Sequence, residues 1–162
     1  MTSFESGLKR LNRTDVFVVI DTMAFLKALG DISPFSDALN CLVKICNKIA
    51  ITTEVLREYK CKVTAEGMTN VILMRKIKDL ERIGKTKEVH RTQLNHAKTL
   101  IQTANLPLPT DSFDHKFFEA AIACKARYIV TTDPGSLNLN PYNHPPVDMK
   151  IVTPTEYIIE NC

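Results

Sequence analysis

The chain has 162 residues, of which 44% are hydrophobic and 24% are charged, and its formal net charge is +3. This length suits one domain with one buried core, and the balanced composition excludes collagen-like, fibrous and disordered chains. The longest purely apolar runs hold about five residues, whereas a membrane-spanning helix needs roughly 20. The first ten residues, MTSFESGLKR, lack the basic and apolar regions of a secretory signal. We therefore expect a cytoplasmic protein with no membrane partner.

The net charge of +3 conceals an uneven distribution along the chain. Between Lys60 and Lys98 there are ten Lys or Arg and four Asp or Glu, a local net charge of +6, so the remainder carries −3. Such a block is typical of a solvated helical face, or it is a cationic platform for a polyanion. Charge alone favours the solvated face.

The five cysteines form an odd count and contain no CxxC pair. We therefore expect reduced thiols. Cys124 lies in an Ala-rich helical stretch, where we expect it to pack as a small hydrophobic residue. Cys162 is the last residue, and its position predicts nothing.

The first third of the chain predicts five elements. Residues 16–20 (VFVVI) form an apolar run without alternation, which is typical of a strand buried on both faces. A short helix is expected at 23–29. A second helix is expected from about 33 to 48, because a Ser-Pro pair supplies an N-cap and a first-turn proline. A brief strand at 49–51 and a helix at 54–61 follow.

The charged block occupies roughly residues 64–104. The helical spacing of its apolar residues predicts two antiparallel helices separated at Gly84, which would form a basic helical arm. The LPLP sequence that follows cannot continue a helix.

The last third predicts a helix at about 111–125, strands at 128–131 and 150–152, and a terminal helix opened by a capping box at 153–156. The alternation of strands and helices predicts a three-layer α/β/α fold with a central, mostly parallel sheet of four or five strands. Neither a domain boundary nor a repeat is visible, so residues 1–162 are expected to form one domain.

Acidic side chains gather at one edge of this predicted sheet. Ligands of open parallel sheets bind outside the carboxyl ends of the strands. Asp21 directly follows the first strand, Asp133 follows the third, and Asp114 opens the helix that leads into the third strand. Glu54 and Glu58, one turn apart on the helix after the second strand, share a face. At least four carboxylates are therefore expected to converge.

Clustered carboxylates repel one another and raise one another's pKa values, so such a cluster is seldom explained by stability. It is well suited to Mg²⁺ or Mn²⁺, which prefer carboxylate, carbonyl and water oxygens. Each acid taken alone is explained equally well as a turn or helix N-cap. Their joint placement favours a metal site.

Other kinds of site find less support. Neither GxGxxG nor GxxxxGK[ST] occurs, and the four histidines show no HExxH or zinc-ribbon spacing. A phosphatase with an aspartyl nucleophile at Asp21 would need an acid two residues later, where Met23 stands.

Three segments resemble the PIN domain, a family of metal-dependent nucleases with a compact α/β/α fold. They are VFVVIDTMAFL, ITTEVLREY and, most strongly, DHKFFEAAIACKARYIVTTDPGSL. The third is similar to the branch of the family described as toxin components of toxin–antitoxin systems. The order and spacing of the segments extend the resemblance from about residue 16 to residue 153.

The resemblance implies which residues form the site. It implies catalytic, metal-binding carboxylates at Asp21, Glu58, Asp114 and Asp133, with Glu54 as the alternative to Glu58. It implies a supporting hydroxyl at Thr22. In the expected mechanism Thr22 or Thr132 orients a carboxylate or the phosphate, and His115, beside Asp114, either supports the site or has a structural role. His115 stands where many relatives have Asp or Asn.

The resemblance also changes the interpretation of the basic block. PIN domains act on RNA, whose phosphates need cationic side chains to position them. The RNA contacts are then expected from Arg75, Lys76, Lys78, Arg82, Lys85, Lys87 and Arg91.

The implied function is Mg²⁺- or Mn²⁺-dependent hydrolysis of RNA phosphodiester bonds, in which the metal activates a water molecule. The protein would then be the toxin of a pair whose partner is a small antitoxin, or an RNA-processing nuclease, and it could form a homodimer. A non-cleaving RNA-binding or interaction module, and metal-dependent DNA cleavage as in flap nucleases, are the alternatives.

Overall fold

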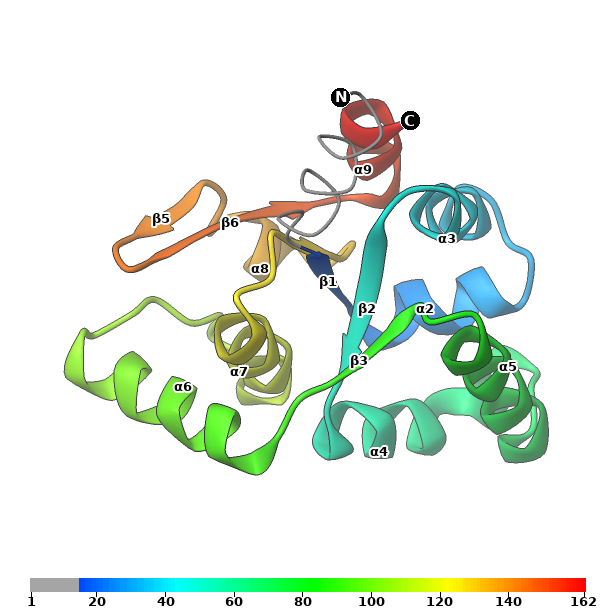
Figure 1. Cartoon of the computed structure of the whole chain (residues 1–162), viewed down its shortest axis with the longest axis horizontal. Helices are drawn as coiled ribbons and strands as arrows, with labels where there is room; N and C mark the ends of the chain where they lie inside the picture. Colours follow the sequence, from blue (N-terminus) through cyan, green and yellow to red (C-terminus); the bar gives the residue numbers. More distant parts are fainter. Residues whose placement is uncertain (1–14) are drawn as a thin grey trace, which may run out of the picture.

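The computed structural model describes residues 15–162, and its centre is a six-stranded sheet in the order β3-β2-β1-β4-β6-β5 (Figure 1). All neighbouring strands pair in parallel except β5 and β6, which are antiparallel. The expectation about the first ten residues falls outside the described part. The strands are β1 (Val16–Ile20), β2 (Asn47–Ile51), β3 (Thr86–Glu88), β4 (Tyr128–Val130), β5 (Tyr142–His144) and β6 (Val147–Val152).

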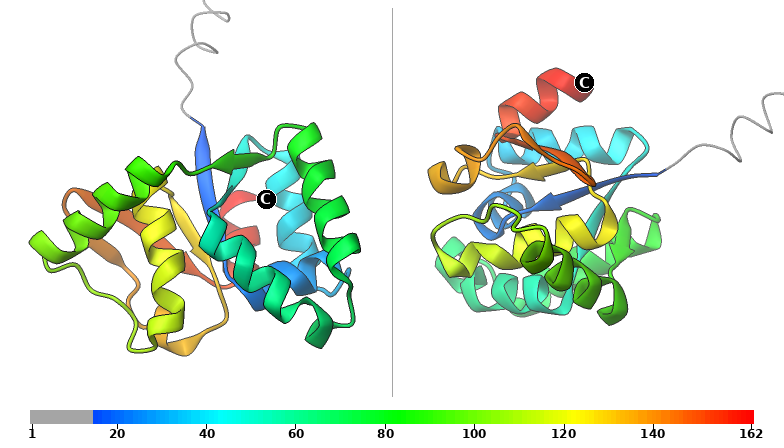
Figure 2. Two further views of the ribbon diagram at one scale, coloured as in Figure 1. Left: turned by 90° about the horizontal axis from the view of Figure 1, so that it is seen from below. Right: turned by 90° about the vertical axis from the view of Figure 1, so that its left-hand side faces the viewer.

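Helices cover both faces of the sheet (Figure 2). They are α2 (Thr22–Leu29), α3 (Phe35–Lys44), α4 (Thr53–Lys62), α5 (Asn70–Arg82), α6 (Arg91–Thr103), α7 (His115–Cys124), α8 (Pro134–Leu137) and α9 (Pro154–Asn161), with 3-10 turns η1 (Val63–Glu66) and η2 (Ser112–Asp114). On one face α3 and α9 pack against each other, and on the other α7 packs against β1, β2, α4 and α6. The predicted three-layer α/β/α fold is confirmed. None of the described helices is long and apolar enough to cross a membrane.

The central strands form as the apolar pattern predicts. Val18 and Val19 of β1 are fully buried, and Val18 lies in register with Ile49 on one side and Tyr128 on the other. Burial on both faces explains why β1 lacks polar alternation. Beneath the carboxyl end of β1, the ring of Phe25 stacks on Tyr59 at 4.5 Å between centroids.

The helix expected to reach residue 48 is shorter than predicted. α3 ends at Lys44, and Ile45 is already extended. Asn47 starts β2, because it pairs with Val16 of β1. Helical spacing continues to Ile49 in the sequence, but sheet pairing overrides this local preference.

The two helices expected at 64–104 form, but they do not make an antiparallel arm. Gly84 ends α5 in the left-handed region at φ 74°, and residues 86–88 then form β3, which pairs with β2. α6 packs on α7, on the other side of β3 from α5 (Figure 1). The edge strand β3 therefore separates the helices.

The sheet also has one strand more than the four or five expected. β5 turns back on β6 from the Pro-rich stretch, which the sequence presents only as loop. Tyr142 holds it in place, because its ring is fully buried and its hydroxyl donates to the Pro107 carbonyl oxygen at 2.6 Å.

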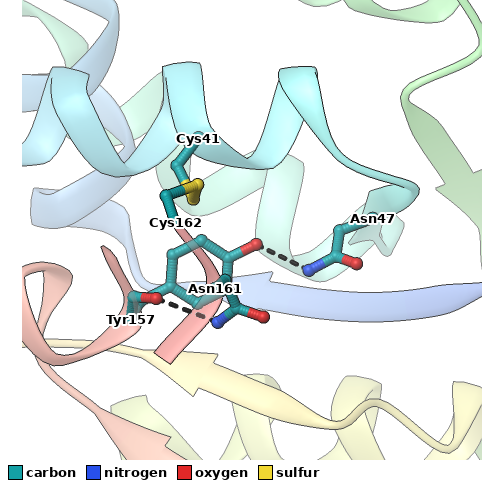
Figure 3. The surroundings of a disulfide bond; sticks show 5 residues. All are labelled: Cys41, Asn47, Tyr157, Asn161 and Cys162. Carbon is teal, nitrogen blue, oxygen red and sulfur yellow. Dashed lines mark hydrogen bonds between the residues drawn. A yellow bond between two sulfur atoms is a disulfide. The ribbon is translucent and has the colours of Figure 1, made fainter. Parts of the chain in front are cut away.

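The cysteines differ from the expectation of reduced thiols. Cys41 on α3 and Cys162 at the end of α9 form a disulfide bond across 121 residues (Figure 3). No local spacing in the sequence could indicate a pair so far apart. Cys124 is buried, as predicted, whereas Cys46 and Cys61 are exposed free thiols.

Candidate active site

A pocket of about 480 Å³ opens at the carboxyl edge of the sheet. Asp21 follows β1, Asp133 lies just beyond β4, Glu58 lies in the second half of α4, and Asp114 ends η2. All four predicted carboxylates line this one pocket, together with the predicted Thr22 and Thr132. The strand-edge argument therefore predicts correctly that these side chains lie together, while their roles as ligands stay a prediction.

Asp21 is fixed by two hydrogen bonds. It is the N-cap of α2, where its Oδ1 accepts from the Ala24 amide at 2.9 Å. Its Oδ2 accepts from the hydroxyl of Thr131. Burial raises the pKa of Asp21, while the Thr131 and Ala24 hydrogen bonds oppose this shift. The carboxylate is thus both a helix cap and a preoriented oxygen donor at the pocket.

Thr131 is the residue that the sequence interpretation missed. Its side chain is 1% exposed, and its Oγ1 also accepts from the Asp133 amide at 2.9 Å. One hydroxyl therefore links the acid after β1 to the acid after β4. Asp133 is itself an N-cap, because its Oδ2 accepts from the Ser136 amide at 2.8 Å. The only signal in the sequence was the two-residue spacing between Thr131 and Asp133.

The other acids around the pocket affect the pKa of Asp114. Burial, followed by the charges of Asp133, Asp111, Asp21 and Glu58, raises its pKa from 3.8 to about 6. This shift indicates that the carboxylates act on one another through the pocket. A bound cation would relieve their repulsion.

This shift predicts a pH dependence of stability without metal. Because the pKa of Asp114 is raised in the folded protein, the folded state binds more protons than the unfolded state between about pH 4 and 6. Its contribution is therefore destabilising above that window, and stability should be lost as pH rises through it. The free energy of unfolding, measured with urea in the presence of EDTA, should differ less between pH 5 and pH 7.5 for Asp114→Asn than for the native chain. Asp148→Asn, an exposed change outside the pocket, should keep the native difference. An unchanged difference in Asp114→Asn would contradict this assignment.

Glu58 is held by α7. Its Oε2 lies 2.8 Å from Nζ of Lys116, and the two side chains are 17% and 20% exposed. This contact is at ion-pair distance, but its angles do not make a hydrogen bond, so Oε2 is buried without a hydrogen-bond partner. Glu54 does not line the pocket and instead pairs with Lys98 at 3.4 Å. The structure thus places Glu58, and not its alternative, at the pocket.

His115 contacts the backbone near η2 and does not line the pocket. Its Nε2 lies 2.7 Å from the Pro109 carbonyl oxygen. Beneath the site, the buried Tyr59 hydroxyl donates to the Ile20 carbonyl oxygen at 2.6 Å. Burial, then the charges of Asp21 and Glu58, raise the pKa of Tyr59. This bond ties α4 to the end of β1, which sets Glu58 opposite Asp21.

The donor set fits a hard divalent ion. All the donors are oxygens, and two buried ones, Thr22 Oγ1 and Glu58 Oε2, have no hydrogen-bond partner. Within residues 15–162, no three His, Cys, Asp or Glu side chains form a preformed ligand cluster. Mg²⁺ commonly keeps several waters and takes only one or two carboxylates directly. The oxygen donors that line the pocket therefore match Mg²⁺ or Mn²⁺ in chemical type.

The seven basic residues do not share one face. Arg75, Lys78 and Arg82 line a groove along α5 together with Lys60. Lys85 Nζ donates to the Ile45 carbonyl oxygen at 2.6 Å. Of the rest, Lys76 lines a second groove beside α2 and α3, Lys87 lies over the Phe17 ring, and Arg91 starts α6.

Comparisons with known proteins agree with this architecture. A family model described as PIN domain matches residues 17–134. A chain of VapBC2 from Rickettsia felis, crystallised bound to a DNA fragment from their promoter, is structurally similar with a TM-score of 0.52. The two sequences are 18% identical, and the match covers 84% of this chain and 98% of that one, so the likeness shows the fold. Curated protein sequences gave no match.

Proposed function

The chain belongs to the PIN domain family, whose members are typically nucleases that use divalent metals, and we propose that it is an Mg²⁺- or Mn²⁺-dependent endoribonuclease. The observation that carries this proposal is the convergence of Asp21, Glu58, Asp114 and Asp133 on one pocket. A bound ion would supply a water of lowered pKa and would offset negative charge on the scissile phosphate.

The chain's own residues have separate tasks in this proposal. Asp21 and Asp133, which are both hydrogen-bonded to Thr131, present oxygens that are oriented before an ion binds. Thr22 Oγ1, buried without a partner, is free to contact a water or a phosphate oxygen. The groove along α5 supports RNA as substrate, because within the described residues Lys60, Arg75 and Lys78 make no ion pair and can attract a phosphate backbone, while Arg82 pairs with Asp79 at 3.3 Å.

The likeness to a VapBC2 chain favours, among nucleases, a toxin held by a small antitoxin protein over an RNA-processing enzyme. The distinction is tested in cells. Expression of the native chain should arrest growth, and coexpression of a small protein encoded beside it should relieve the arrest.

The enzymatic proposal is tested with a mixed RNA pool. The native chain should cleave it with Mn²⁺ and not with EDTA, and a DNA pool of the same sequences should stay intact. Cleavage of DNA alone would redirect the proposal to DNA. Absence of both cleavage and Mn²⁺ binding would favour a non-cleaving binding module.

Two substitutions one turn apart on α4 test the site itself. Glu58→Gln should lower the cleavage rate by at least about a hundredfold. Removing a residue that only hydrogen-bonds to a metal ligand costs up to about a hundredfold, and removing a ligand itself should cost no less. Glu54→Gln should stay within about threefold, because its partly exposed ion pair with Lys98 contributes little. Equal losses in the two variants would contradict the placement of Glu58.

A further inference from the structure

Lys116 lies in the first turn of α7, beside the carboxylate pocket. It follows Asp114 by two residues and reaches back to Glu58 of α4, at 2.8 Å from Oε2. Four-fifths of each side chain is buried. Burying an ammonium costs free energy unless a carboxylate compensates it, so Lys116 depends on Glu58 in the absence of another partner.

The charges around the pocket are strongly unequal. Its lining contains six carboxylates, those of Asp21, Glu58, Glu66, Asp111, Asp114 and Asp133, against one ammonium, that of Lys62. Lys62 is exposed, and within residues 15–162 it makes no ion pair. Lys116 is therefore the one described cation that contacts a carboxylate of the pocket.

We propose that Lys116 is an internal counter-cation that competes with the metal ion for Glu58 and so weakens metal binding to the pocket. This inference rests on the proposed function, because it concerns the same site. An ammonium and a divalent ion cannot both take Glu58 Oε2 at close range, since like charges repel strongly in a partly buried site. Metal binding then requires Lys116 to move away from Glu58.

The structure supplies a second place for the ammonium. Lys116 Nζ also lies 5.9 Å from the ring centroid of Phe113, which is 71% exposed. A cation within about 6 Å of an aromatic face is attracted to it. A displaced Lys116 therefore keeps the exposed Phe113 ring as a partner, which lowers the cost of the exchange. If Lys116 instead only oriented Glu58 as a ligand, its removal would weaken metal binding, which is the opposite sign.

The test is Mn²⁺ titration by calorimetry at fixed ionic strength. Lys116→Met, which keeps the apolar stem and removes the charge, should bind Mn²⁺ at least about tenfold more tightly than the native chain. Lys116→Arg should bind like the native chain. Lys62→Met is the matched control, because it removes the same charge from the pocket lining without an ion pair to Glu58, and its gain in Mn²⁺ affinity should be about twofold or less. In a Glu58→Gln background, Lys116→Met should show no more gain than Lys62→Met.

The outcomes separate this inference from the proposed function. Equal or weaker binding by Lys116→Met overturns the competition, while Mn²⁺ binding by the native chain leaves the nuclease proposal intact. No binding by any variant overturns both. If Lys116→Met binds Mn²⁺ and the native chain does not, Lys116 prevents metal binding completely, which supports the competition. Circular dichroism melts establish that each variant is folded, and Lys116→Gln replaces Lys116→Met if that chain does not fold.

Discussion

Replacing Asp21 by Asn should lower metal-dependent RNA cleavage by on the order of a thousandfold or more, because a neutral amide is a poor ligand for a hard divalent ion. The structure favours Asn over Ala for this experiment. Asn is as good an N-cap as Asp, so the bond to the Ala24 amide can persist. The Thr131 hydroxyl can accept from the new amide while it still accepts from Asp133. The loss should therefore be chemical and not structural.

The measurement is the initial rate of cleavage of one RNA with saturating Mn²⁺, alongside Mn²⁺ binding by calorimetry and a thermal melt. Asp148→Asn, the same substitution on an exposed position of β6 outside the pocket, should keep the native rate. Native activity in Asp21→Asn would remove Asp21 from the site. A melting temperature far below that of the native chain would show that the cap, and not the ligand, had been lost.

The positions of the carboxylates could be predicted because they depend on few facts. Once β1 and β4 are recognised as parallel strands, the residues that follow them must meet at one edge. The choice between Glu54 and Glu58 could not be derived from spacing, because residues four apart share a face. Only the second half of α4 lines the pocket, through Glu58 and Lys62, whereas Glu54 in the first turn pairs with Lys98.

The residues that contact the carboxylates could not be predicted from the sequence. Thr131 and Lys116 are unremarkable in the chain, and their contacts depend on how β4 and α7 are rotated. The short strands β3 and β5 were missed for a related reason. Three residues carry no measurable alternation, so their state is decided by pairing with residues tens of positions away. The sequence favours one surface for the basic block, because the three residues of β3, which divide the block, show no strand pattern.

The disulfide between α3 and the C-terminus has the largest expected effect on stability. Breaking it should lower the melting temperature by roughly 10 °C. In the chain-entropy model, a bond that closes a loop of this order stabilises the folded state by about 4–5 kcal/mol. Each kcal/mol corresponds to about 2–4 °C in a domain of this size. The loop is long, since the two cysteines are 121 residues apart. Cys41 is only 4% exposed, so the reduced thiol stays packed against the core.

The loss should stop short of unfolding, because α9 has other anchors. The Tyr157 ring is buried and meets Tyr128 edge-on at 5.3 Å, and its hydroxyl accepts from Asn47 Nδ2 at 2.7 Å (Figure 3). The last turn, which holds Asn161 and Cys162, lies beyond these anchors and is held by its own hydrogen bonds to the Tyr157 and Ile158 carbonyl oxygens. Reduction should therefore increase fraying of that turn and leave β2 and β6 in place.

Melts of the native chain with and without a phosphine reductant measure this effect, and Cys162→Ser should melt like the reduced native chain. Cys46→Ser removes an exposed free thiol and should melt like the oxidised chain. A thiol count under denaturing, non-reducing conditions should find three thiols, those of Cys46, Cys61 and Cys124. Identical melts in both redox states would exclude a stabilising bond. Mn²⁺ binding should be unchanged by reduction, because α3 and α9 cover one face of the sheet while Glu58 and Lys116 lie on helices of the other.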